Sequence, residues 1–199
     1  VDDIQSHMLN FLENHDEQRI ASDFFAGDAE KGKPALLVSA LMNTNPMMIY
    51  FGQELGEKGM DSEGFSGLDG RTTIFDYWTI DLIRRWRNAN KFDGALLTEE
   101  EKSLQKYYSR VLNICNSEKA IREGGFFDIM YVNRGEGMDE HRQYAFLRKQ
   151  DKELIVVVAN FADEPARSWV KIPAHAFDCL GIPAEEKERE CKDLLTGKK

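Results

Sequence analysis

The first 60 residues alternate between apolar runs typical of strands and one typical of a helix. Residues 8–12 form a short apolar run that ends in the polar segment 13–19, which predicts a buried strand carrying polar groups at its C-terminal end. Pro34 then stands where a helix would start, ahead of the apolar run 35–42, and residues 47–51 form a second strand-like run. Two apolar strands joined through a helix predict a βαβ unit, which lies in a parallel sheet covered by helices.

A stretch rich in glycine and acidic residues, 53–72, separates this unit from two predicted helices, and its length predicts a long loop. The first helix has one apolar face, formed by Trp78, Leu82, Ile83 and Trp86. The second begins at Thr98, which forms a capping box with Glu101 three residues later. Its apolar positions are Leu104, Tyr108, Val111, Leu112 and Cys115.

The pattern changes near residue 118. Four β-rich runs separated by polar turns follow, at residues 126–132, 143–148, 153–161 and 168–172. Closely spaced strands without helices between them indicate an antiparallel sheet or sandwich. The predicted fold class is therefore an α/β part over residues 1–118, followed by an all-β antiparallel part over residues 119–199.

Composition and charge exclude several classes of function. The 199 residues include 35 acidic and 26 basic side chains, a formal net charge of −9, which disfavours nucleic acid as a partner. No apolar run approaches the roughly 20 residues of a membrane span. The three cysteines, far apart and without CxxC spacing, predict free thiols, and the four histidines predict no metal site. Residues 64–68 fail the GxSxG pattern because the fifth position is leucine.

The densest polar cluster follows the first predicted strand, at residues 13–19. A carboxylate, an imidazole and a guanidinium at the C-terminal end of a parallel strand suit recognition of a polyhydroxyl ligand, because α/β folds place their sites at that edge. The alternative is that Asn14 and Asp16 only cap or turn the chain. Spacing alone leaves both interpretations open.

Residues 10–16 (Asn-Phe-Leu-Glu-Asn-His-Asp) resemble the F-x-x-N-H-D motif of the α-amylase family, glycoside hydrolase family 13, where it ends the seventh strand of a (β/α)8 TIM barrel. Residues 46–56 resemble the eighth strand and the loop after it, and residues 74–78 the segment leading to the last barrel helices. Residues 144–148 and 156–161 resemble the C-terminal β-sandwich. The resemblance implies the last two βα units of a TIM barrel over residues 1–118, then most of an antiparallel sandwich over residues 119–199.

The resemblance also implies a function. A retaining glycosidase would cleave α-1,4-glucosidic bonds in starch-like glucans, with Asp16 stabilising the transition state and His15 and Asn14 binding sugar. In the family the nucleophile and general acid come from the fourth and fifth strands, so this chain alone is expected to be an inactive fragment. No cofactor is expected, calcium being an option only in the full-length enzyme. Arg19 is expected to brace the loop, and the acids Asp2, Asp3, Glu54 and Glu57 are interpreted as solvated.

Other classes of function stay open at this stage. One is a non-catalytic carbohydrate-binding module using Trp169 as an aromatic platform, and another is a catalytically dead amylase-like scaffold. The expected ligand is an α-glucan or maltooligosaccharide. Since two strands cannot close a barrel of eight, self-association of the chain is expected. A periplasmic, cell-surface or secreted location is expected rather than a cytoplasmic one.

Overall fold

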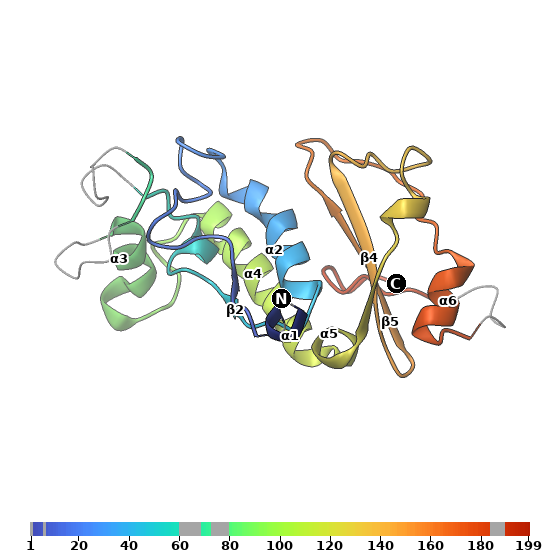
Figure 1. The fold of residues 1–199 in the computed structure, drawn as a ribbon. Coiled ribbons are helices and arrows are strands. Elements are labelled where there is room, and N and C mark those ends of the chain that lie inside the picture. Colours follow the sequence, from blue (N-terminus) through green and yellow to red (C-terminus); the bar gives the residue numbers. More distant parts are fainter. Residues whose placement is uncertain (1, 6, 60–68, 73–79, 184–189) are drawn as a thin grey trace. The chain divides into compact units, whose positions relative to one another are not determined.

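The computed structural model describes residues 2–5, 7–59, 69–72, 80–183 and 190–199. The chain divides into two compact units (Figure 1). The β1–β2 unit contains Leu9–Leu36 and Pro46–Ser109, and the sheet unit contains Val1–Met8, Leu37–Asn45 and Arg110–Lys199. Residues 64–68 and 74–78, Trp78 included, lie outside the described residues. The boundary expected between residues 118 and 119 stays a prediction.

The described chain contains six α-helices and five β-strands. The helices are α1 (Asp2–Gln5), α2 (Gly32–Leu41), α3 (Asp81–Arg87), α4 (Glu99–Ser117), α5 (Lys119–Glu123) and α6 (Ala174–Leu180). The strands are β1 (Asn10–Phe11), β2 (Met47–Met48), β3 (Gly125–Asp128), β4 (Gln143–Gln150) and β5 (Glu153–Asn160). Within this part of the chain, no helix combines the length and apolarity needed to cross a membrane.

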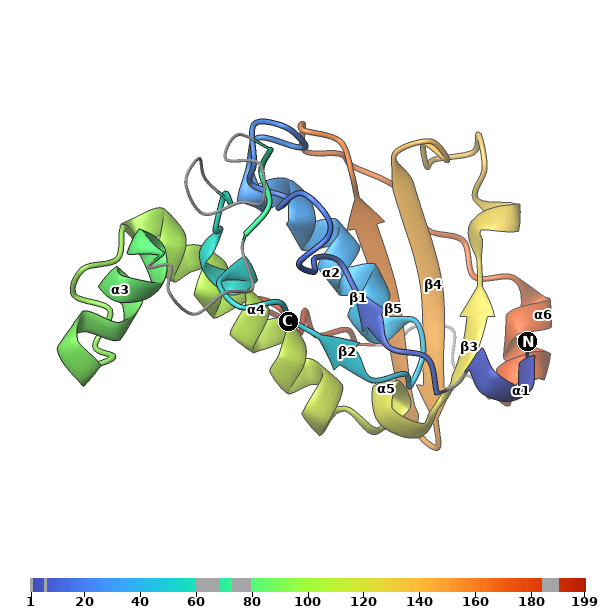
Figure 2. The same ribbon diagram turned by 60° about the vertical axis from the view of Figure 1, so that its left-hand side comes forward.

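The βαβ unit predicted from the sequence is confirmed. β1 and β2 pair in parallel, with Asn10 opposite Met47 and Phe11 opposite Met48, and α2 follows β1 and precedes β2 along the chain (Figure 2). The expectation that residues 8–12 form a buried strand is wrong, because Met8, Leu9 and Phe11 are 45–52% exposed. A parallel sheet of two short strands leaves most of each strand surface without a neighbour. The expected self-association stays a prediction.

The capping box that starts α4 is also confirmed. The Thr98 backbone N–H donates to Glu101 Oε2 over 2.8 Å, and the Glu101 backbone N–H donates to Thr98 Oγ1 over 3.2 Å. The guanidinium of Arg85 on α3 also donates to both Glu101 carboxylate oxygens, over 2.7 and 2.6 Å. These bonds hold the pKa of Glu101 below its ordinary value, so the carboxylate stays charged. One carboxylate therefore caps α4 and ties it to α3.

Three of the four predicted C-terminal strands are confirmed as an antiparallel sheet of order β3-β4-β5. The strand predicted at residues 168–172 is wrong. In that segment the Lys171 N–H donates to Asn133 Oδ1 over 2.7 Å, and the Lys171 carbonyl accepts from Asn133 Nδ2 over 3.0 Å. Because an amide side chain satisfies this backbone, the segment forms no strand ladder.

α6 was not predicted from the sequence. It begins after Pro173 and ends at Gly181, whose positive φ of 60° is typical of a helix C-cap. Ala176 of α6 is fully buried in a core that also contains Ile129 and Leu147. The helix therefore packs on the sheet, and the C-terminal part of the described chain is mixed rather than all-β.

Removing the Thr98 hydroxyl tests the cap of α4. Thr98→Ala is expected to lower the free energy of unfolding by about 1 kcal/mol, because an N-cap acceptor is lost. Ser103→Ala is the matched control, since Ser103 is exposed in the same helix. Urea unfolding followed by circular dichroism measures both. Equal midpoints for the two variants would contradict the assigned cap.

Candidate functional site

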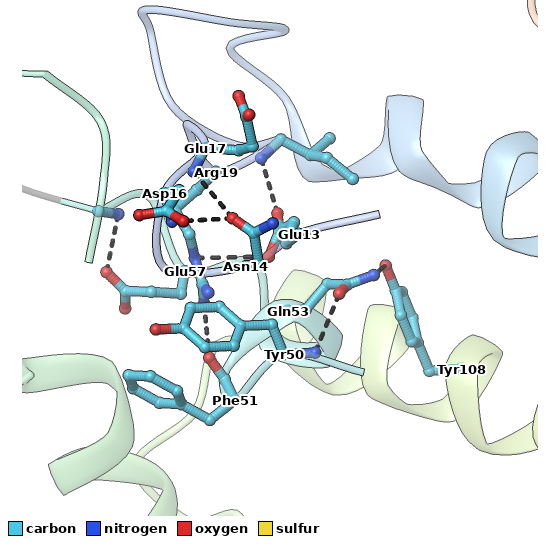
Figure 3. Close-up of polar contacts among 12 residues, drawn as sticks. Glu13, Asn14, Asp16, Glu17, Arg19, Tyr50, Phe51, Gln53, Glu57 and Tyr108 are labelled. Carbon is cyan, nitrogen blue, oxygen red and sulfur yellow. Dashed lines mark hydrogen bonds and ion pairs between the residues drawn. The ribbon is translucent and has the colours of Figure 1, made fainter. Parts of the chain in front are cut away.

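The loop after β1 is folded by the side chain of Asn14. Its Oδ1 accepts hydrogen bonds from the backbone N–H groups of Asp16, over 2.8 Å, and Glu17, over 3.0 Å (Figure 3). Such Asx turns reverse the chain locally. The sequence left open whether Asn14 binds a ligand or turns the chain. The structure shows the turn role, because the Asn14 side-chain oxygen accepts two backbone N–H groups.

His15 and Asp16 lie together on the outside of this turn. His15 Nε2 is 3.4 Å from Asp16 Oδ2, and the two side chains are 47% and 71% exposed. The Asp16 carboxylate is thus available to a ligand instead of being consumed by buried partners. The structure brings together the two residues that the sequence singled out for sugar contact, and their assigned roles stay predictions.

Beneath the turn lies a buried ion pair between Glu13 and Arg19, which are 2% and 0% exposed. Glu13 Oε2 is 3.4 Å from Arg19 Nε, and Glu13 Oε1 accepts the backbone N–H of Ile20 over 2.7 Å. Burial raises the pKa of Glu13, while the Arg19 charge and the Ile20 N–H act in the opposite direction. Glu13, at the start of the loop, is therefore tied to Arg19 and Ile20 at its end. The polar pattern of residues 13–19 does not reveal this role.

Arg19 also joins this loop to the segments that follow β2. Its Nη2 donates to the carbonyl of Phe51 over 2.5 Å, and its guanidinium carbon lies 4.7 Å from the centre of the Tyr50 ring (Figure 3). Its backbone N–H donates to the Gly70 carbonyl over 2.8 Å. The expectation that Arg19 braces the loop is confirmed.

A glycine is required where this brace meets the next loop. Gly59 has a positive φ of 63°, and a Cβ there would lie 2.5 Å from the Gly70 carbonyl oxygen and 2.8 Å from Arg19 Cγ. Both distances are shorter than a side chain tolerates, so only glycine fits this position. The backbone at residues 59 and 70 is consequently held directly against Arg19.

The interpretation of Glu57 as a solvated acid is wrong. Glu57 is 5% exposed, and its Oε1 accepts the backbone N–H of Gly59 over 2.9 Å. Its carboxylate is buried because it closes the turn that places Gly59 beside Arg19. Glu54 is half-buried and Asp3 is exposed.

Several polar atoms around this brace have no hydrogen-bond partner among the described residues. They include Arg19 Nη1 and the hydroxyl of Tyr50. Burial raises the pKa of Tyr50; the Arg19 charge opposes this rise, and the charges of Glu13 and Asp16 add to it. The Tyr50 hydroxyl therefore stays protonated. Over the same described ranges, no group of three or more His, Cys, Asp or Glu side chains could hold a metal ion.

Replacing Arg19 tests whether the brace holds this end of the β1–β2 unit. Arg19→Met is expected to lower the free energy of unfolding by about 3–5 kcal/mol, because Glu13 is left buried without its partner. Arg84→Met is the control, since Arg84 is 65% exposed and lies 3.9 Å from Asp81; it should change stability by less than about 0.5 kcal/mol. Chemical denaturation of both variants makes the comparison, and equal losses would contradict the brace.

The raised pKa of Glu13 predicts a pH dependence of stability. A carboxyl whose pKa is raised on folding contributes stability below its ordinary value of 4.5 and loses that contribution as pH rises through the folded-state pKa. The free energy of unfolding of the unsubstituted chain, relative to Glu13→Gln, should therefore fall as pH rises above 4.5. Denaturation at several pH values measures this difference, with Glu17→Gln as the exposed control in the same loop. The same slope for both substitutions would count against it.

The sequence and the fold of the chain were compared with those of known proteins. No protein-family model matches the chain. Over 153 residues, 77% of its length, the chain is 27% identical to a cyclomaltodextrinase from a Bacillus species and spans 22% of that protein. Its fold matches the crystal structure of AmyP in complex with maltose with a TM-score of 0.52 and 20% identity, covering 77% of this chain and 30% of that one.

A noncanonic maltogenic α-amylase, AmyB from Thermotoga neapolitana, gives a TM-score of 0.46 at 17% identity, over 78% of this chain and 28% of that one. The chain thus spans less than a third of each of these proteins. The cyclomaltodextrinase match rests on sequence and the AmyP match on fold, so the two are separate observations. Together they confirm the resemblance of this chain to enzymes of the α-amylase family of glycoside hydrolases.

Proposed function

We propose that the chain is the C-terminal part of a retaining α-amylase-type glycoside hydrolase. In this proposal β1, α2 and β2 belong to the last two βα units of a TIM barrel, and the antiparallel sheet β3-β4-β5 belongs to the C-terminal β-sandwich. Support comes from the parallel pairing of β1 with β2 and from the antiparallel sheet that follows it. Further support is the 27% identity to a cyclomaltodextrinase, of which the chain spans 22%.

The proposed substrate is an α-1,4-linked glucan such as a maltooligosaccharide. One relative is named a cyclomaltodextrinase, and AmyP was solved in complex with maltose. The loop after β1 offers groups of the right kind, since hydroxyls of a sugar can donate to the Asp16 carboxylate and accept from His15. A neutral ligand also agrees with the net charge of −9, which disfavours anionic substrates.

The observation that carries the proposal is the exposed His15–Asp16 pair standing on a buried Glu13–Arg19 brace. Glycoside cleavage passes through an oxocarbenium-like transition state, which a fixed negative charge stabilises. Asp16 has that charge within reach of a ligand, and the brace reduces the motion of the loop that holds it. In this assignment His15 binds sugar, while Asn14 contributes through the turn and through its amide nitrogen.

Asp16 would assist the cleavage without performing it. Retaining hydrolysis needs a carboxylate nucleophile and a carboxylic acid about 5 Å apart, on either side of the bond. Glu57 is a poor candidate, because its carboxylate is buried and accepts the Gly59 N–H in its own turn. We therefore assign the nucleophile and the acid to other strands of the full-length enzyme.

Two assays test this function. The pure 199-residue chain is expected to release no reducing ends from maltoheptaose. In the full-length enzyme, Asp16→Asn is expected to lower kcat by roughly 10²–10³-fold, because a preorganised charge that favours the transition state is removed. Glu17→Gln, which changes the neighbouring exposed carboxylate, is the control and should leave kcat within about twofold. Hydrolysis by the isolated chain, or full activity of the Asp16→Asn enzyme, would contradict the proposal.

A further inference from the structure

A concave surface lies entirely within the sheet unit, on segments that the proposed catalytic loop does not use. It is a shallow, open depression with a cavity volume of about 660 Å³. Its walls come from residues 131–136 on one side and 171–173 on the other, and they carry the side chains of Tyr131, Arg134, Glu136 and Lys171. Apolar and polar groups are therefore mixed in one small area.

A single buried side chain holds the two walls in register. Asn133 is 0% exposed and donates from Nδ2 to the carbonyls of Ile129, over 2.6 Å, and Lys171, over 3.0 Å. Its Oδ1 accepts the Lys171 N–H over 2.7 Å. Three hydrogen bonds from a buried amide fix the depression before any ligand arrives, which lowers the entropic cost of binding.

One exposed aromatic ring lines this depression, and a second lies two residues before one of its walls. Tyr131 lines it and is 52% exposed, and Trp169 precedes the second wall by two residues and is 76% exposed. A Cβ on Gly137 would lie 3.1 Å from the Trp169 carbonyl oxygen and 3.6 Å from Trp169 Cβ, so Trp169 emerges next to the turn that follows Glu136. Tryptophan is highly buried on average, so an indole this exposed leaves a large apolar surface in water that a ligand can cover.

The charges of the depression favour a neutral ligand. Lys171 Nζ and Glu136 Oε2 form an ion pair across the two walls. Lys171 holds the pKa of Glu136 below its ordinary value, so the carboxylate remains an acceptor. With the lysine charge compensated by Glu136, Arg134 is the remaining charged side chain in the lining, which is less positive charge than the clusters of cations that bind phosphate or sulfate groups.

We propose that this depression is a second carbohydrate-binding site, at which Trp169 and Tyr131 stack on glucose rings and Arg134, Glu136 and Lys171 bind their hydroxyls. The choice of an α-1,4-glucan as the ligand rests on the proposed function. Sugar rings present a C–H face that packs on an aromatic ring and an equatorial edge of hydroxyls that takes hydrogen bonds, and both are matched here. A site of this kind retains a polymer near the enzyme and raises its effective concentration at the catalytic loop.

The test is titration of the 199-residue chain with maltoheptaose, followed by isothermal calorimetry and tryptophan fluorescence. The unsubstituted chain is expected to bind weakly, with a Kd of about 1 mM. Trp169→Ala is expected to raise the Kd at least tenfold, and Tyr131→Ala at least threefold, while Trp169→Phe and Tyr131→Phe retain most of the binding because a ring remains. Both alanine variants change exposed side chains, so their thermal unfolding should match the unsubstituted chain.

The controls separate this site from the catalytic loop. Phe25→Ala removes another largely exposed ring, 67% exposed, in the β1–β2 unit and should leave the Kd unchanged. Asp16→Asn should also leave the Trp169-dependent binding unchanged. Binding that disappears with Asp16→Asn and survives Trp169→Ala would overturn this inference and leave the proposed function intact. Full activity of the Asp16→Asn enzyme, together with Trp169-dependent binding, would overturn the proposed function alone.

Two further results would also overturn the inference. The first is no detectable binding of maltoheptaose to the unsubstituted chain at about 20 mM ligand, at which a site with a Kd of about 1 mM is nearly saturated. The second is a change of oligomeric state in light scattering on Trp169→Ala, which would make the exposed ring a contact between copies of the chain.

Discussion

The candidate active-site loop depends on one buried ion pair. Burying two charges is costly unless each is paired and hydrogen-bonded, and Glu13 and Arg19 satisfy much of that need through each other, the Ile20 N–H and the Phe51 carbonyl. The same arginine contacts the segments that follow both parallel strands, so the loop after β1 and the loop after β2 share one anchor. Asp16 takes no part in these buried contacts, and its side chain is 71% exposed.

In each of the two units, a buried polar side chain links backbone segments that no strand pairing joins. In the β1–β2 unit an arginine links segments that lack a strand ladder between them, and in the sheet unit a buried asparagine, Asn133, links the 129–138 loop to the segment before α6. In both cases backbone groups form hydrogen bonds with a side chain and not with another strand: the Phe51 carbonyl with Arg19, and the Lys171 carbonyl and N–H with Asn133. The functional surfaces that we propose, at Asp16 and at Trp169, each lie beside such a link.

Features set by local pattern could be predicted from the sequence. The capping box at Thr98 depends only on residues three apart, and the strand-helix-strand order of residues 8–51 follows from apolar runs. Features set by distant partners could not. Glu13 is buried against Arg19, and Glu57 is buried because it accepts the Gly59 N–H. The sequence alone does not reveal these partners, so acidic residues in a polar segment are interpreted as solvated. The composition of segment 168–172 predicts a strand because it does not reveal that Asn133 hydrogen-bonds to the backbone of that segment. For α6, Pro173 before the helix and Gly181 after it are sequence signals typical of a helix start and a helix end.

The Asn133 link has a consequence for chemical ageing. Its nitrogen donates to two carbonyl oxygens, a task that only an amide can perform. Conversion of that amide to a carboxylate would replace the donor with a charged acceptor facing both carbonyls, and like-signed groups would push the two loops apart. Deamidation of Asn133 would thus separate the two walls of the depression beside Tyr131. It would do so without changing any residue that is proposed to contact a ligand.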